Sequence, residues 1–184
     1  MKRNLAVVFG GKSVEHDISI ITGNQLMDNA DLEKYNIIPI YIARNGVWFT
    51  GPKLRDMKFM KNFDAADRSI KRVYISPASE SRELMEVSGG IFSSPKAVCK
   101  LDAAILAMHG MHGEDGTLQG LFELAGIPYS SPGVLGSAVG MDKIVMKAVF
   151  KGCGLPVLPG VHFSRSEWQK DAEAVLNKIE SELP

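Results

Sequence analysis

Apolar residues occur along the chain in short runs that predict a buried sheet. The run "LAVVF" at 5–9 ends in two glycines, and "LDAAILAM" at 101–108 leads into another glycine-rich loop. Short apolar runs of this kind are typical of strands that are buried on both faces, as in parallel sheets. "NIIPIYIA" at 36–43 predicts a further strand, with a hairpin turn at Asn45-Gly46 after it.

Helical spacing of apolar residues predicts a helix after the first strand. Val14, Ile18 and Ile21 lie on one side of this helix and are expected to face inward, with Ser13 as its N-cap. A strand, a helix and a strand in this order predict a right-handed βαβ unit.

The rest of the chain contains further elements and one irregular excursion. "TLQGLFELAG" predicts a helix that ends at Gly126, while 76–96 is rich in Ser, Pro and Gly and predicts a hairpin. A helix at 141–152 is expected to bury Ile144, Val145, Ala148 and Val149. "VLPGVHF" at 157–163 predicts a strand, and a capping box of Ser164 and Glu167 predicts another helix that buries Trp168, Ala172, Val175 and Ile179.

These elements predict an α/β protein with two domains. Residues 1–136 are expected to form a Rossmann-like domain around a parallel sheet. Residues 137–184 have one candidate strand and no sheet for it to join, so they are expected to form only the beginning of a second domain.

Composition restricts the classes of partner. The formal net charge is zero, so binding to a polyanion such as nucleic acid has no electrostatic support. No apolar run approaches the roughly 20 residues that span a bilayer. Two cysteines without metal-ligand or CxxC spacing favour a reducing compartment. We therefore expect a soluble, cytoplasmic protein.

Candidate chemistry lies in the loops that follow the two buried strands. The first loop leads to Glu15, and the second contains His109, His112, Glu114 and Asp115. Ligands of open parallel sheets bind outside the carboxyl ends of the strands, so these side chains are candidates for a ligand site. The sequence has neither GxGxxG nor GxxxxGK[ST], and the nucleotide sites that depend on those motifs are not indicated.

Several of these residues also have a purely structural explanation. Glu15 and His16 are about 100° apart on a helix, so only one of them can point into a cleft, and the pattern does not decide which. Glu15 could be present only because a negative charge at the start of a helix interacts favourably with the helix dipole. His109 could form hydrogen bonds only with backbone groups. His112 lies in a glycine turn and is expected to be exposed.

Lys143, Lys147 and Lys151 recur every four residues, as on a solvated basic face. A lysine close to a helix start nevertheless opposes the dipole, and Lys143 therefore indicates an anionic partner.

The motifs "GGKSVEHDIS", "MHGMHGEDGTLQGLFELAGIPYSSPGVLGSAVGMDK" and "KGCGLPVLPG" resemble those of D-alanine–D-alanine ligase, and the resemblance covers essentially the whole chain. That family consists of ATP-grasp enzymes of peptidoglycan precursor synthesis. The resemblance implies that Glu15 is a catalytic and substrate-binding residue, which binds the ammonium group of the first D-alanine and helps hold a hydrogen-bond network of the active site. It places His109, as a catalytic and substrate-binding residue, and the substrate-binding Gly110 backbone beside this substrate and its acyl phosphate. It assigns Lys143 to the phosphates of ATP.

The resemblance also implies ATP and Mg²⁺ as cofactors of the complete enzyme and a homodimer as its assembly, with no metal ligand in this segment. The family continues for well over a hundred residues past the position of Pro184. The chain would thus be the N-terminal domain and the beginning of the central ATP-grasp domain, inactive by itself. Two alternatives remain open: a non-catalytic module that binds an amino acid, and a metal hydrolase that uses His109, His112, Glu114 or Asp115.

Overall fold

The computed structural model describes residues 1–78, 81–87 and 94–183, which form two compact units. The first unit is Met1–Met141 and the second is Asp142–Pro184. The boundary expected from the sequence, between 136 and 137, falls within helix α4 (Val134–Met141). Each unit is described by itself.

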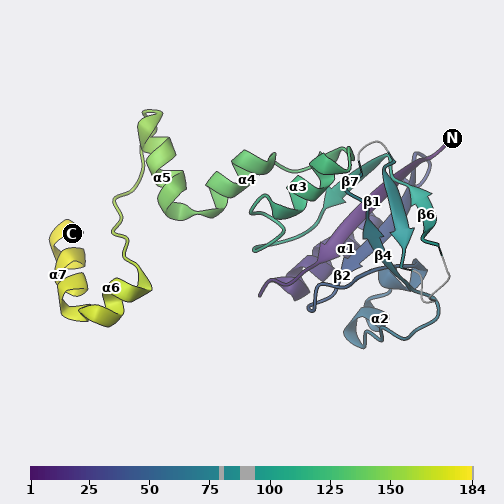
Figure 1. Ribbon diagram of the computed structural model, residues 1–184, viewed down its shortest axis with the longest axis horizontal. Helices are drawn as coiled ribbons and strands as arrows, with labels where there is room; N and C mark the ends of the chain where they lie inside the picture. The colour runs from purple at the N-terminus through teal and green to yellow at the C-terminus, as the bar shows by residue number, and fades with distance from the viewer. Residues whose placement is uncertain (79–80, 88–93, 184) are drawn as a thin grey trace. The chain divides into compact units, whose positions relative to one another are not determined.

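One mixed sheet forms the centre of the first unit (Figure 1). Its strands, in the order β6-β5-β4-β3-β2-β1-β7-β8, are β6 (Lys96–Lys100), β5 (Glu83–Glu86), β4 (Lys71–Ile75), β3 (Trp48–Thr50), β2 (Tyr35–Ile42), β1 (Arg3–Gly10), β7 (Ala103–Leu106) and β8 (Tyr129–Ser130). The strands β2, β1, β7 and β8 are parallel, as the sequence predicts.

The remaining part of the sheet is antiparallel, which a purely parallel prediction misses. β2, β3, β4, β5 and β6 follow one another as antiparallel neighbours. The turn at Asn45-Gly46 joins β2 to β3, and the excursion at 76–96 contains β5 and the beginning of β6. Its residues 79–80 and 88–93 lie outside the described part of the chain. The turn between β2 and β3 is too short for a crossover connection, so β3 can pair with β2 only in the antiparallel sense, and the antiparallel part of the sheet begins there.

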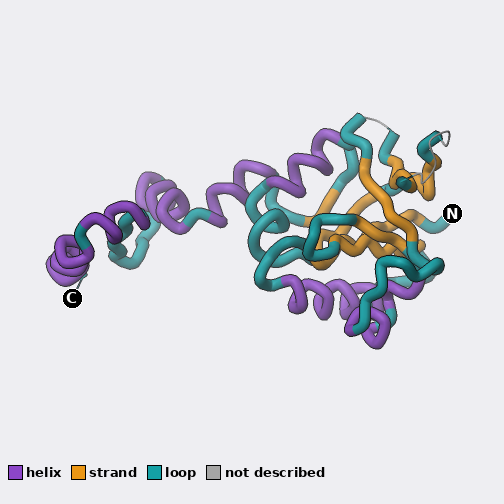
Figure 2. The backbone as a smooth tube through the Cα atoms, turned by 60° about the horizontal axis from the view of Figure 1, so that its bottom comes forward, coloured by secondary structure: helices purple, strands orange, loops and turns teal. Residues whose placement is uncertain are grey.

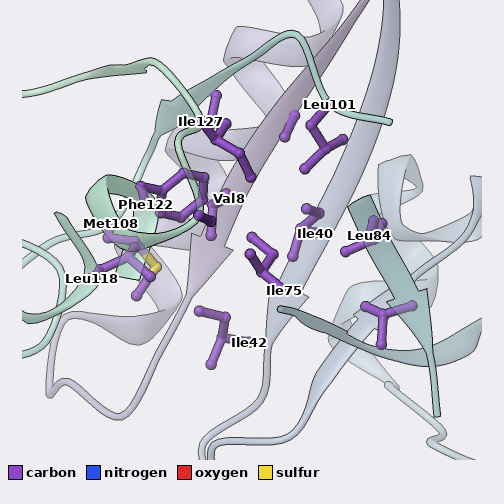
Figure 3. Close-up of a cluster of buried hydrophobic side chains, with 14 residues drawn as sticks. Val8, Ile40, Ile42, Ile75, Leu84, Leu101, Met108, Leu118, Phe122 and Ile127 are labelled. Carbon is purple, nitrogen blue, oxygen red and sulfur yellow. The ribbon is translucent and has the colours of Figure 1, made fainter. Parts of the chain in front are cut away.

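β1 is buried on both faces because its side chains alternate between two apolar clusters. Ala6 and Val8 belong to one cluster with Phe122 of α3 (Thr117–Leu124), as Figure 3 shows for Val8 and Phe122. Val7 and Phe9 belong to the other cluster. The continuous apolar run in the sequence therefore predicts this central strand correctly.

Helices cover both faces of the sheet (Figure 2). α3 packs on the first cluster, whereas α1 (His16–Asp28) and α2 (Met57–Lys61) pack on the second, next to the 3₁₀ turn at Pro52–Arg55. The predicted inward face of α1 is wrong. Val14, Ile18 and Ile21 are exposed, and α1 instead buries His16, Ser19, Ile20, Gly23, Asn24 and Met27.

The second unit consists of α5 (Lys143–Gly152), α6 (Arg165–Lys170) and α7 (Ala172–Glu182). The predicted capping box of Ser164 and Glu167 is present, and Glu167 accepts a hydrogen bond from the Ser164 amide at 2.6 Å. The predicted strand at 157–163 and the buried face of α5 are wrong: 157–163 is irregular and α5 has no buried residue. The sequence predicts burial of Trp168, Ala172, Val175 and Ile179. Val175 is buried in the structure, and the other three are not. Among the described residues, no helix is long and apolar enough to cross a membrane.

Candidate functional site

The two candidate loops meet beside the central strand of the sheet. β1 lies between β2 and β7 and is parallel to both, so the chain leaves β1 toward one side and later returns to its other side. This reversal is the switch point at which open α/β sheets bind ligands, outside the carboxyl ends of the strands. Glu15 follows β1 at this edge, and His109 and Gly110 follow β7.

Of the adjacent residues Glu15 and His16, Glu15 is the one whose side chain points toward the second loop. Its backbone amide donates a hydrogen bond to Ser13 Oγ at 3.1 Å, and its carboxylate lies against the α-carbon of Gly110. A β-carbon on Gly110 would collide with the Glu15 carboxylate and lie 2.6 Å from Ser13 Oγ. Gly110 also has φ of 71°, a left-handed conformation that favours glycine. The structure therefore brings these two predicted site residues together.

His16 is buried under the first loop and is 2 % exposed. Its Nδ1 lies 2.6 Å from the carbonyl oxygen of Gly11, and its Nε2 lies 3.1 Å from the Tyr41 hydroxyl. A carbonyl oxygen can only accept, so Nδ1 carries a proton, and in that neutral tautomer Nε2 accepts from the Tyr41 hydroxyl. Burial raises the pKa of Tyr41, and its hydroxyl keeps the proton that it donates. His16 thus fixes the loop, whereas Glu15 is available to a ligand.

A polar face of α1 holds the segment that follows β7. Glu15, Ser19 and Thr22 share this face because they are spaced by four and three residues. The Ser19 hydroxyl accepts from the Gly10 amide at 2.8 Å and donates to the carbonyl of Ala107 at 2.6 Å. Sequence reasoning misses Ser19 and Thr22; their spacing from Glu15 is the signal that could have found them.

His109 and Gly110 are held from two directions. His109 Nε2 lies 2.9 Å from Thr22 Oγ1 of α1. The Gly110 amide donates to Glu114 Oε2 at 2.6 Å, so Glu114 supports the loop in this structure. The His109 side chain is half-buried and Gly110 is buried. These contacts define where the loop lies relative to Glu15.

Asp115 organises the last part of the loop. Its carboxylate accepts hydrogen bonds from the His112 amide at 2.9 Å and from the Thr117 amide and hydroxyl at 3.0 and 2.7 Å. Partial burial favours the neutral carboxyl, but these hydrogen bonds outweigh it and lower the pKa of Asp115. His112 is exposed, as the sequence predicts, and has a left-handed φ of 65°. Asp115 therefore has a structural role.

Asp115→Asn is expected to lower the free energy of unfolding at pH 7 by about 1–2 kcal/mol, because an amide N–H then faces a backbone N–H. A lowered carboxyl pKa stabilises the fold above its ordinary value of 3.8, and this contribution is lost as the pH falls through the lowered value. Urea denaturation at pH 7 and pH 3 measures both effects. A difference between wild type and variant that is equal at the two pH values would contradict this role.

Lys143 lies in the second unit, at the first position of α5. Asp142 caps this helix and accepts from the amides of Ile144 and Val145 at 2.9 and 3.0 Å. Lys147, one turn later, donates to the carbonyl of Leu158 at 3.1 Å. Lys143 is exposed, and it belongs to a different compact unit from Glu15, His109 and Gly110.

The described residues contain no group of three or more His, Cys, Asp or Glu side chains that could hold a metal ion. His112 Nδ1 lies 3.9 Å from Asp115 Oδ2, but Asp115 is occupied by the loop amides. The geometry thus offers nothing specific to the metal hydrolase alternative.

The fold is that of an α/β domain in which two loops present a carboxylate and an imidazole at the switch point of the sheet. The model of the family described as "D-ala D-ala ligase N-terminus" matches residues 4–132. The chain belongs to this family, as its motifs suggest.

Known relatives agree with this assignment. The chain is 38% identical over 182 residues to a D-alanine–D-alanine ligase of Macrococcus caseolyticus and 40% identical over 184 residues to one of Streptomyces avermitilis. These matches cover 99% and 97% of the chain but 47% of each relative, so the chain spans about half the length of these ligases. The crystal structure of VanG D-Ala:D-Ser ligase from Enterococcus faecalis is similar with a TM-score of 0.78 and 31% identity, over 100% of this chain and 50% of that one.

Proposed function

We propose that the complete protein is an ATP-dependent ligase that joins two D-alanines for peptidoglycan precursor synthesis, and that this chain contributes the site of the first D-alanine. Membership of the ligase family supports the reaction. The observation that carries the proposal is the Glu15 carboxylate beside Gly110 and the loop of His109. Within the described residues no hydrogen bond or ion pair engages this carboxylate, so it can pair with the ammonium group of an amino acid.

The reaction assigns a role to each predicted residue. ATP supplies the phosphoryl group that converts the carboxylate of the first D-alanine into an acyl phosphate. The amine of the second D-alanine then attacks the acyl carbon, and phosphate leaves. Glu15 orients the first substrate, while His109 and the Gly110 backbone lie beside its reacting carboxylate. Lys143 contacts the phosphates of ATP; its position at a helix start, where a cation opposes the dipole, supports an anionic partner.

The cofactors are proposed for the complete protein. They are ATP and Mg²⁺, as the resemblance to the ligase family implies. We propose that residues 137–184 begin the ATP-grasp domain and that the complete protein acts in the cytoplasm, where ATP is supplied.

The test is product analysis. The complete protein, incubated with ATP, Mg²⁺ and D-alanine, is expected to form D-alanyl-D-alanine, detected by mass spectrometry, and to form no dipeptide from L-alanine. Failure to form any dipeptide from D-alanine would contradict the proposed reaction.

A second candidate function is amino-acid binding without catalysis. One observation favours it: Glu15, His109 and Gly110 all lie in the first unit. This function predicts saturable binding of D-alanine to the 184-residue chain. A flat calorimetric titration in the millimolar range would argue against it.

We also propose that the complete protein is a homodimer that associates through α1. Ile18 and Ile21 of this helix and Val14 just before it have 56%, 43% and 99% of their surfaces exposed, and such an apolar face suits a second copy. Light scattering is expected to give twice the monomer mass. A monomer at high concentration would contradict the proposal.

A further inference from the structure

The contact between Thr22 of α1 and His109 bears on which nitrogen of the imidazole ring carries a proton. Thr22 Oγ1 lies 3.1 Å from the carbonyl oxygen of Ile18, one turn earlier in α1, and 2.9 Å from His109 Nε2. The carbonyl oxygen can only accept, so the geometry assigns the hydroxyl proton of Thr22 to it. A hydroxyl has one proton and two lone pairs. With its proton on that carbonyl, Thr22 meets His109 Nε2 with a lone pair, and a neutral His109 ring then has its proton on Nε2.

We infer that Thr22 is a positioning residue that holds the neutral His109 ring in its Nε2–H tautomer. In that tautomer Nδ1 has no proton and is an acceptor. Among the described residues no hydrogen bond engages Nδ1, so Nδ1 is the ring nitrogen left for a ligand. This arrangement is the reverse of that of His16, where Nδ1 carries the proton because it faces the Gly11 carbonyl at 2.6 Å.

The tautomer determines which ligand group His109 can meet. A neutral ring with a free Nδ1 accepts from an N–H donor and has no proton to offer an oxygen from that side. Nδ1 thus suits the ammonium group of the first D-alanine, which the Glu15 carboxylate also recognises. His109 then lies beside the reacting carboxylate as a group that positions the substrate, without donating a proton from Nδ1. This consequence rests on the proposed function, whereas the tautomer itself rests only on the contacts of Thr22.

Thr22 is well placed for this role because its own geometry is fixed. It lies on α1 three residues after Ser19, which joins the ends of β1 and β7 through Gly10 and Ala107. The helix and the loop of His109 are thereby tied together near the Thr22 contact. Valine has the shape of threonine without the hydroxyl, so Thr22→Val removes the acceptor with little change in packing. Thr22→Ser retains the hydroxyl and is the matched control.

Nitrogen-15 NMR of the 184-residue chain at a pH where histidines are neutral tests the tautomer directly. The chain has four histidines, and His109→Gln identifies the signals of His109. We expect a protonated Nε2 in His109, a protonated Nδ1 in His16, and a His109 Nε2–H signal that exchanges slowly with water. This signal is expected to persist in Thr22→Ser and to be lost in Thr22→Val. A protonated Nδ1 in wild-type His109, or an unchanged signal in Thr22→Val, would overturn the inference.

Kinetics of the complete protein test the positioning role. Thr22→Val is expected to lower kcat/KM for D-alanine by about tenfold, the size of one hydrogen bond, and Thr22→Ser to restore most of it. Equal activity of Thr22→Val and wild type would overturn the role. If the wild-type complete protein shows no activity with D-alanine while the NMR result is as expected, the proposed function fails and the tautomer assignment stands.

Discussion

Glu15→Gln is expected to lower kcat/KM of the complete protein for D-alanine by about 10- to 150-fold, which corresponds to the roughly 1.5–3 kcal/mol of a charge-assisted hydrogen bond. The carboxylate lies against Gly110, and no described residue competes for it. The amide of glutamine keeps the shape of the side chain but loses the charge that pairs with an ammonium group. The loss should appear in the dependence on D-alanine and leave the KM for ATP nearly unchanged.

Glu33→Gln is the matched control for this variant. Glu33 is also an exposed carboxylate of the first unit, but it precedes β2 and thus lies near the amino ends of the strands. We expect wild-type kinetics for Glu33→Gln. Equal kinetics of Glu15→Gln and wild type, measured under saturating ATP, would contradict the proposed pairing with the substrate ammonium.

Gly10→Ala is expected to be among the most destabilising single substitutions at the site. Gly10 ends β1 with φ of 91°, a conformation that costs an L-residue about 1–2 kcal/mol. A β-carbon would also collide with the backbone carbonyl of Ile42 and lie 2.8 Å from the Tyr41 ring. Overpacking of this kind costs about 1–3 kcal/mol, so we expect a total loss of about 2–5 kcal/mol in the free energy of unfolding.

Urea denaturation of the chain measures this loss, and Gly120→Ala is its control. Gly120 lies within α3, where nothing stands within 4 Å of an added β-carbon. Alanine favours helix over glycine by about 0.5–1 kcal/mol, so this variant should be equally stable or slightly more stable than wild type. Equal unfolding midpoints for Gly10→Ala and Gly120→Ala would show that the end of β1 is not constrained as described.

The central strand and the position of the site could be predicted from the sequence because both depend on strong local signals. A continuous apolar run at 5–9 requires burial on both faces, and β1 is buried between the two apolar clusters. Glycine-rich loops after two such strands place Glu15 and His109 at the same edge of a parallel sheet. The roles of the individual residues are predicted only from the resemblance of the motifs to the family.

The orientation of α1 could not be predicted because its buried face mixes small and polar residues with only two large apolar ones, Ile20 and Met27. Apolar periodicity favours Val14, Ile18 and Ile21, which are exposed, whereas Ser19 and Asn24 are buried. Ser19 is buried because its hydroxyl satisfies the ends of two strands, a contact between residues far apart in sequence. The choice between Glu15 and His16 follows from the same orientation. No local pattern reveals such a contact.

The second unit shows a different limit of sequence reasoning. The capping box of Ser164 and Glu167 is local and is present as predicted. A strand at 157–163 would need a neighbouring strand to pair with, and no strand in the described part of the chain pairs with this segment. The apolar side chains of Ile144, Val145 and Val149 are exposed on α5, although their spacing predicts burial.

The central claim is that this chain is the first-substrate half of a D-alanine ligase. D-alanine-dependent release of phosphate from ATP tests it most directly, measured in parallel on residues 1–184 and on the complete protein. We expect release by the complete protein and none by residues 1–184. Release by residues 1–184 alone would contradict the division of the site, and no release by either would contradict the ligase function itself.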